Sequence, residues 1–297
     1  MSRTKIMILV VALALVVGGA LGYSQRSTNK TVPVGSLPEY FNFGNNYVFS
    51  IPGSYIVDSQ SVLGAELVYS TPISAKTVED VYSQNGMAIQ AVDLSDHSAQ
   101  AFKDYVNNKY VPQLKQSLST EDIAVKFGKT NGNDNARITV KKDGGQIRFI
   151  YLRNGQHPTS LIAKSETDNF KVIEQTIKDV ESSDLKNEAG TIKQTLQNSL
   201  QLAKSQKDQD LYNSGSPELR AQTTLPQLTA ALNAAGTYLS QNITVSGGSY
   251  KSPEFSAALR FTPPGQNNAQ PAIGAITLKK SDNQWKVEAL SLPAPKQ

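Results

Sequence analysis

The feature that most constrains how this chain can fold is an uncharged apolar segment near its start. It runs from Ile6 to Tyr23, which gives 18 consecutive residues without a charged side chain. A helix of that length rises about 27 Å at about 1.5 Å per residue, enough to cross the hydrocarbon core of a bilayer. Arg3 and Lys5 lie before it, and positive residues beside a membrane span favour the cytoplasmic side. We expect a single-pass protein of the cell membrane, with a cytoplasmic N-terminus and the rest of the chain extracytoplasmic.

A cleaved signal peptide is the alternative interpretation of this segment. The small residues Ala20-Leu21-Gly22 suit a signal peptidase site, although the apolar run is long for such a peptide. The residues that follow are polar and typical of a flexible tether. The organisation that we expect is a cytoplasmic flank at 1–5, an anchor at 6–23, a tether at 24–36, a first α+β domain at 37–183 and a second α+β domain at 184–297.

The charge balance argues against nucleic acid as a partner. The net charge of +4 comes entirely from residues 1–32, which hold four basic side chains and no acidic ones, so that 25 basic and 25 acidic residues remain elsewhere. Nucleic-acid binding normally needs a clustered basic face. The chain has no cysteine, which excludes disulfides, thiolate metal sites, cysteine nucleophiles and a lipid-bearing cysteine. We expect no metal and no cofactor.

The first domain opens with a strand. Tyr47, Phe49 and Ile51 alternate along one face of it, and Pro52-Gly53 ends it, because proline cannot continue a strand ladder. Further strands are expected within residues 64–72, 86–94, 122–130, 135–155 and 159–166. The segment 135–155 is expected to be a hairpin that turns at Asp143-Gly144-Gly145.

Two helices are expected among these strands. The first lies within residues 95–118, with Ser95 or Asp96 at its N-cap and Pro112 kinking or dividing it. Its apolar stripe consists of Phe102, Val106, Tyr110 and Leu114. The second lies at 168–183, and its stripe consists of Phe170, Ile173, Ile177 and Val180. The order of strands, helix, strands and helix predicts an antiparallel sheet with helices on one side.

These segments together resemble the PsbP-like family. The resemblance lies in "YVFSIPGSYIVD", "LVYSTP", "AFKDYV" and "FIYLRNGQHPTSLIAKSETDNFKVIEQTIKDV", and it covers about residues 40–183. It implies an α+β sandwich and a binding or assembly role outside the cytoplasm. Tyr55 stands where the family often has tryptophan.

The second domain places helices before strands. The apolar stripe of its first helix consists of Ile192, Leu196, Leu200, Ala203 and Leu211. Ser216 is expected to cap a turn that starts at Pro217, and Thr224 with Gln227 forms a capping box. Three strand segments follow, at 242–252, 254–264 and 272–292. The last is a hairpin that turns at 281–283, with Trp285, Val287 and Ala289 on one face.

This second pattern resembles the nuclear transport factor 2-like cone. The segment that carries the resemblance best is "LKKSDNQWKV", within about residues 187–293. The resemblance implies a conical pocket between helices and a curved sheet. The same cone serves isomerases, dehydratases and assembly modules, so the fold alone does not fix the function.

Candidate catalytic residues are sparse. His97 and His157 both lie in loop sequences, and the second domain has no histidine, which argues against a dehydratase-type site. Asp208, Asp210 and Tyr212 have the residue types of an isomerase site, but their surroundings are so polar that a solvated helix end is favoured. The segment 131–135, "NGNDN", lacks the spaced acids of a calcium loop and is expected to be a tight turn.

Four aromatic residues of the second domain are the candidate ligand-binding set. They are Tyr212, Tyr238, Phe261 and Trp285. Aromatic side chains line small-molecule pockets, and they also fill ordinary cores, so both interpretations stay open. A cavity with an ionisable group near Trp285 would favour an enzyme, whereas a filled aliphatic core would favour a binding module.

The function expected from the sequence is a membrane-anchored, non-catalytic binding or assembly module of the cell envelope. Its expected partners are the membrane, through residues 6–23, and other envelope proteins, with a small-molecule ligand as a further option. The alternative is a cone-fold enzyme or carrier that acts on a small apolar or cell-wall-derived molecule.

Overall fold

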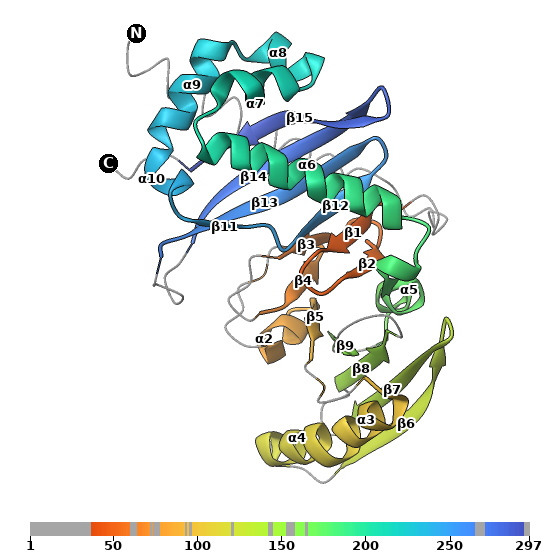
Figure 1. The fold of residues 1–297 in the computed structure, drawn as a ribbon. Helices are drawn as coiled ribbons and strands as arrows, with labels where there is room; N and C mark the ends of the chain where they lie inside the picture. Colours follow the sequence, from red (N-terminus) through yellow and green to blue (C-terminus); the bar gives the residue numbers. More distant parts are fainter. Residues whose placement is uncertain are drawn as a thin grey trace. The chain divides into compact units, whose positions relative to one another are not determined.

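The computed structural model has an α+β architecture (Figure 1). It describes residues 37–59, 64–71, 73, 78–92, 94, 97–119, 122–141, 145–152, 158–163, 166–264 and 271–293. These residues form two compact units, a first unit that ends at Asp184 and a second that starts at Leu185. The expected anchor at 6–23 and tether at 24–36 lie outside the described residues, as do the turn residues 143–144 and His157. Among the described ranges, no helix is both long and apolar enough to cross a membrane.

The first unit contains a seven-stranded antiparallel sheet in the order β3-β4-β5-β9-β8-β7-β6. Its strands are β3 Ile56–Asp58, β4 Glu66–Tyr69, β5 Met87–Ala91, β6 Ile123–Thr130, β7 Asn133–Val140, β8 Gly145–Tyr151 and β9 Pro158–Ala163. Three further strands pair with one another, namely β1 Glu39–Asn42, β2 Tyr47–Ser50 and β10 Lys178–Asp179. The helices are α2 Val78–Ser83, α3 Ala99–Asp104, a π-helical segment Tyr105–Tyr110, α4 Val111–Leu118 and α5 Asp168–Thr176, followed by a 3-10 turn at Val180–Ser182.

Both faces of the seven-stranded sheet are covered. Ile147 and Phe149 of β8 pack with Phe102 of α3, Val106 of the π-helical segment and Leu114 of α4. Because side chains alternate along a strand, Ile150 points to the other face, where it packs with Phe170 of α5 and with residues of β1 and β2. The expectation of helices on one side only is therefore wrong.

The helical region around Pro112 is divided, as the sequence predicts. The backbone N–H of Val111 donates to the carbonyl of Val106, five residues back, so that a π-helical segment separates α3 from α4. Pro112 has no N–H and its ring would clash with the carbonyl four residues earlier, which favours a break here. The N-cap is Ser98 rather than Ser95 or Asp96, since its side chain accepts from the N–H of Ala101 at 3.0 Å.

The second expected helix is shorter than its apolar spacing suggests. It ends at Thr176, and Ile177 is extended. The chain then forms β10, in which Lys178 pairs with Val48 of β2. Phe170, Ile173, Ile177 and Val180 are nonetheless all buried. Pairing with β2 therefore ends the helix while the buried stripe is kept.

The second unit places five helices of its described residues before an antiparallel sheet. They are α6 Lys186–Lys204, α7 Asp208–Ser214, α8 Pro217–Gln222, α9 Leu225–Ala234 and α10 Gly236–Leu239. The strands are β11 Asn242–Thr244, β12 Gly247–Lys251, β13 Glu254–Thr262, β14 Ala272–Ser281 and β15 Gln284–Ser291. Strands β12 to β15 pair in sequence order, and β11 pairs with the far end of β13. Helix α6 lies across this sheet (Figure 1).

The capping and turn predictions for the second unit are confirmed. Ser216 caps α8, and Thr224 with Gln227 forms the capping box of α9. Asp282 and Asn283 have φ of 52° and 59°, the left-handed geometry of a tight hairpin turn. The single helix expected through Leu211 is instead two helices, because α6 ends at Lys204 and Leu211 belongs to α7.

A β-bulge corrects one face assignment in β15. Val287 pairs with Leu278, whereas Ala289 pairs with Thr277, so Glu288 is the extra residue. An extra residue shifts the following side chains to the opposite face. Trp285 and Val287 therefore share the buried face and Ala289 does not.

Candidate functional site

The four predicted aromatic residues take part in three different contacts. Tyr238 and Phe261 pack edge to face with ring centroids 6.1 Å apart. Trp285 packs edge to face against Tyr250, with ring centroids 6.2 Å apart. Tyr250 is not one of the four residues predicted from the sequence. Tyr212 lies on α7, where its hydroxyl donates to the main-chain oxygen of Arg220 at 3.5 Å. Phe261 is fully buried and Trp285 is 7% exposed, as core residues are.

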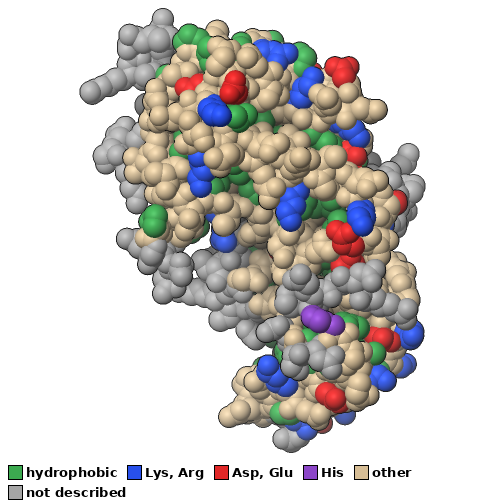
Figure 2. Space-filling model, in the orientation of Figure 1, with side chains coloured by type: hydrophobic (Ala, Val, Ile, Leu, Met, Phe, Trp, Pro, Cys, Tyr) green, Lys and Arg blue, Asp and Glu red, His purple; other side chains and the backbone are tan. Residues whose placement is uncertain are grey.

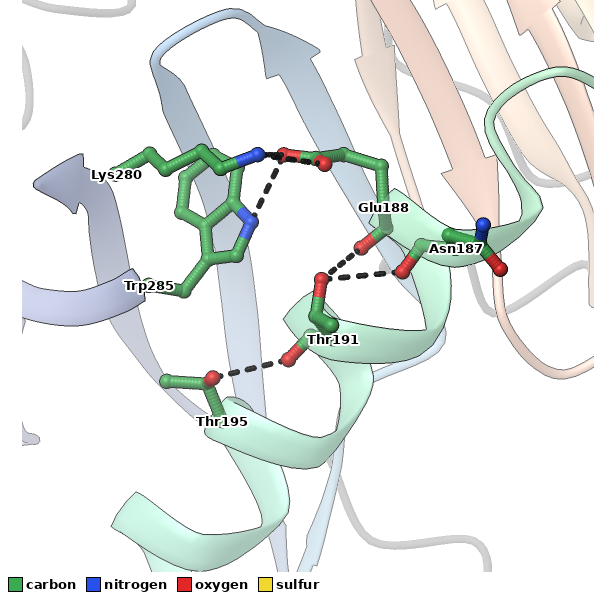
Figure 3. Close-up of polar contacts among 6 residues, drawn as sticks. All are labelled: Asn187, Glu188, Thr191, Thr195, Lys280 and Trp285. Carbon is green, nitrogen blue, oxygen red and sulfur yellow. Dashed lines mark hydrogen bonds and ion pairs between the residues drawn. The ribbon is translucent and has the colours of Figure 1, made fainter. Parts of the chain in front are cut away.

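An ionisable group does lie beside Trp285. Glu188 of α6 accepts from the indole Nε1 at 3.0 Å, and Lys280 Nζ donates to both of its carboxylate oxygens at 3.0 and 2.9 Å (Figure 3). Lys280 and Trp285 are directly opposite each other in the β14–β15 hairpin, so the turn brings them to the same face of the sheet. The cluster thus includes one member of the predicted aromatic set, Trp285.

The first turns of α6 fix Glu188 from the helix side. Thr191 Oγ1 donates back to the carbonyls of Asn187 and Glu188 at 3.1 and 2.9 Å, and Thr195 donates to the carbonyl of Thr191 (Figure 3). The Glu188 side chain is 20% exposed and that of Lys280 is 30% exposed. Both carboxylate oxygens are thus engaged, and the arrangement ties α6 to the hairpin.

The neighbouring Lys279 makes a second ion cluster. Its Nζ lies 2.9 Å from Glu218 of α8 and 3.3 Å from Glu288, the bulge residue of β15. Hydrogen bonding to Glu218 and the charge of Glu288 raise the pKa of Lys279, and the bond to Lys279 lowers the pKa of Glu218. Adjacent lysines therefore tie two different helices to the same hairpin.

The first unit contains a buried carboxyl group, Glu66, that the sequence analysis missed. Glu66 is 6% exposed and accepts from the hydroxyl of Tyr47 and from Nδ2 of Asn42. Asn42 Oδ1 in turn accepts from the backbone N–H of Asn45 at 2.6 Å. Burial raises the pKa of Glu66, and the two hydrogen bonds offset part of that effect. Burial together with the Glu66 charge also raises the pKa of Tyr47.

Mild acidification is expected to stabilise the first unit through Glu66. Because its folded-state pKa is raised, its contribution is fully present below the unfolded value of about 4.3 and is lost as the pH rises through the folded value. Urea unfolding followed by the methyl NMR signal of Ile89, a core residue of this unit, measures the effect at each pH.

The control for this prediction is Glu66→Gln, which cannot ionise. Its stability is expected to depend less on pH than that of the wild type, without becoming flat. Glu39, Glu174 and Asp179 also have pKa values raised by burial, whereas that of Asp184 is lowered by Lys178. Equal pH dependence in the two proteins would contradict the assignment to Glu66.

A charge network on β7, β8 and α5 is the second polar feature of the first unit. Arg148, 5% exposed, contacts Glu166 and lies 3.3 Å from Glu174 of α5. Arg137, its cross-strand partner, lies 2.5 Å from the same oxygen of Glu166. Burial and the charge of Glu166 raise the pKa of Glu174, partly offset by Arg137. The positive charges of the two arginines thus compensate the negative charges of the two glutamates on this face of the sheet.

Comparisons with known proteins give no family assignment. No family model matches the chain, and no curated protein matches it. A crystal structure from Bacteroides thetaiotaomicron VPI-5482 aligns with 77% of this chain and 88% of its own, at 10% identity and a TM-score of 0.30. Among the described residues, no group of three or more His, Asp or Glu side chains is arranged to hold a metal ion.

Proposed function

We propose that this chain is a non-catalytic binding or assembly module of the cell envelope, anchored in the membrane by residues 6–23. The observation that carries the proposal is that both carboxylate oxygens of Glu188 accept hydrogen bonds within the protein. A general acid or base needs an oxygen free to exchange a proton with a substrate. Both oxygens of Glu188 are instead held by Lys280 and Trp285, which supports a structural role for this carboxylate.

The domain identities belong to the same proposal. We assign residues 37–183 to a PsbP-like domain and residues 184–297 to a cone of the nuclear transport factor 2-like type. The order of α6 to α10 before β11 to β15 supports the cone, and the antiparallel sheet with α3, α4 and α5 supports the first assignment. Lysine, arginine and acidic side chains are interspersed on the face in Figure 2, unlike the clustered basic face of a nucleic-acid binder.

Substitution of Glu188 tests the structural role. Glu188→Gln keeps an oxygen that can accept from Trp285 and removes the charge that pairs with Lys280. Because both side chains are partly exposed, we expect a loss of about 1 kcal/mol or less in the free energy of unfolding of the second unit. The fluorescence of Trp285, the single tryptophan, reports that unfolding in urea. A gain in stability would contradict the structural role, because the carboxylate would then not stabilise the contact between α6 and the hairpin.

The anchor is tested on protein recovered from membranes. We expect the chain to keep its N-terminus and to resist alkaline extraction, because 18 uncharged residues gain several kcal/mol in lipid at roughly −0.3 to −0.6 kcal/mol per Leu, Ile, Val or Phe. Ala20→Leu, which blocks signal peptidase, is expected to change neither result. A chain that begins at Tyr23 or Ser24, and that Ala20→Leu converts to a retained form, would defeat the anchor.

A further inference from the structure

A cavity of about 180 Å³ lies in the first unit between its helices and its sheet. One side of it is formed by Tyr82 of α2, Tyr110 of the π-helical segment and Leu114 of α4. Ile147, Ile162 and Gln90 come from β8, β9 and β5 on the other side. These residues belong to the first unit alone, so the cavity is unrelated to the aromatic residues of the second unit.

The strand pairing explains why space is left here. Val140 and Gly145 are directly opposite each other at the end of the β7–β8 pair. Gly145 is two residues from Ile147, so it faces the same helices, but it has no side chain to fill the gap below α4. On the helix side, the π-helical segment ends at Tyr110, whose ring packs edge-on against Phe149 at 4.7 Å. π-helical turns are rare and recur at functional sites.

The lining defines the chemistry of the occupant. The cavity is partly open to solvent. Just over half of its lining residues are aliphatic and none is charged, so no lining side chain supplies a counter-charge for an ionised ligand. The polar residues of the lining are two tyrosines, Tyr82 and Tyr110, and two glutamines, Gln90 and Gln146. A dry apolar cavity of about 150 Å³ is large enough to hold benzene, so this one has room for a single small ring.

We propose that this cavity binds a small neutral molecule of about the size of phenol, with an apolar ring and one hydrogen-bonding group. The ring lies against Ile147, Ile162 and Leu114, and the polar group is solvated by the tyrosine and Gln90 side chains. The proposal adds a ligand site in the first unit to the binding or assembly role, and it stands whether or not the anchor is retained.

Phenol is the probe, and the full-length chain in lipid nanodiscs with labelled isoleucine methyl groups is the sample. We expect saturable shifts at Ile147 and Ile162, and none at Ile89 or Ile173 on the opposite face. Benzoate, which has the same ring and a negative charge, is expected to leave all four signals in place. Nanodiscs without protein correct for phenol that enters the lipid. Shifts that do not saturate, or equal shifts with benzoate, would overturn the proposal.

A matched pair of variants on α4 locates the binding. Leu114→Phe fills the cavity and is expected to weaken the apparent phenol affinity by about tenfold or more. Gln113→Phe adds the same ring to the exposed side of the helix and is expected to bind like the wild type. If Leu114→Phe shifts the methyl signals of Ile89 and Ile173, the variant has altered the fold and cannot locate the binding. The test is then the presence of intermolecular NOEs between phenol and the methyl groups of Ile147 and Ile162 in the wild type. Their absence would refute the site.

Discussion

Replacing Arg148 by methionine is expected to lower the free energy of unfolding of the first unit by about 3–5 kcal/mol, because it breaks a buried ion pair from one side only. The side chain of Arg148 is 6% exposed, and its guanidinium contacts both Glu166 and Glu174. Without it, the Glu174 side chain, 9% exposed, keeps its charge next to that of Glu166. Part of the loss is expected to be recovered in mild acid, since protonation of Glu174 removes the uncompensated charge.

The measurement must report the first unit alone. The single tryptophan, Trp285, lies in the second unit, so we choose amide hydrogen exchange of peptides from β7, β8 and β9 in a urea series. Arg137→Met is the control, because that side chain is 40% exposed and its loss is expected to cost about 1 kcal/mol or less.

A triple variant separates the effect of the lost contact on stability from the effect of the unpaired charge. Arg148→Met combined with Glu166→Gln and Glu174→Gln removes the charges that Arg148 balances. It is expected to be more stable than Arg148→Met alone, since neutral side chains are cheaper to bury than unpaired ions. If Arg148→Met is as mild as Arg137→Met, the network contributes no more than a surface pair.

Local features of this fold could be predicted from sequence because their causes are local. The cap at Ser216 and the box of Thr224 with Gln227 depend on groups three residues apart. The turn at Asp282-Asn283 depends on residues that tolerate positive φ. Each was assigned correctly because no distant segment is needed to form it.

Long-range features could not be predicted in the same way. The end of α5 at Thr176 depends on the pairing of Lys178 with Val48, 130 residues earlier in the chain. Glu188 lies 97 residues from Trp285, and nothing in the spacing of "DLKNEAG" indicates its partners. Its position in the first turn of α6 does favour an acid, and the lysines before the hairpin turn supply the opposite charge. Short elements such as β1, β3 and α2 lack enough residues to display a period.

Gly248→Ala is expected to destabilise the second unit by about 3 kcal/mol, at the upper end of the range for overpacking a filled core. A Cβ at this position would lie 2.3 Å from Cζ of Phe255 and 2.6 Å from the carbonyl oxygen of Ser256. Phe255 is fully buried, so its ring has no free space to enter, and the carbonyl belongs to β13. The two strands would have to separate where β12 pairs with β13.

The same substitution at Gly190 is expected to have the opposite sign. Gly190 lies inside α6, and a Cβ there would meet nothing within 4 Å. Alanine in a helix interior is favoured over glycine by about 0.5–1 kcal/mol, so Gly190→Ala should stabilise the second unit. Urea unfolding followed by Trp285 fluorescence measures both variants with one probe. If Gly248→Ala is as stable as the wild type, the close approach of β12 to the Phe255 ring is not rigid. The two glycine substitutions would then not have effects of opposite sign on stability.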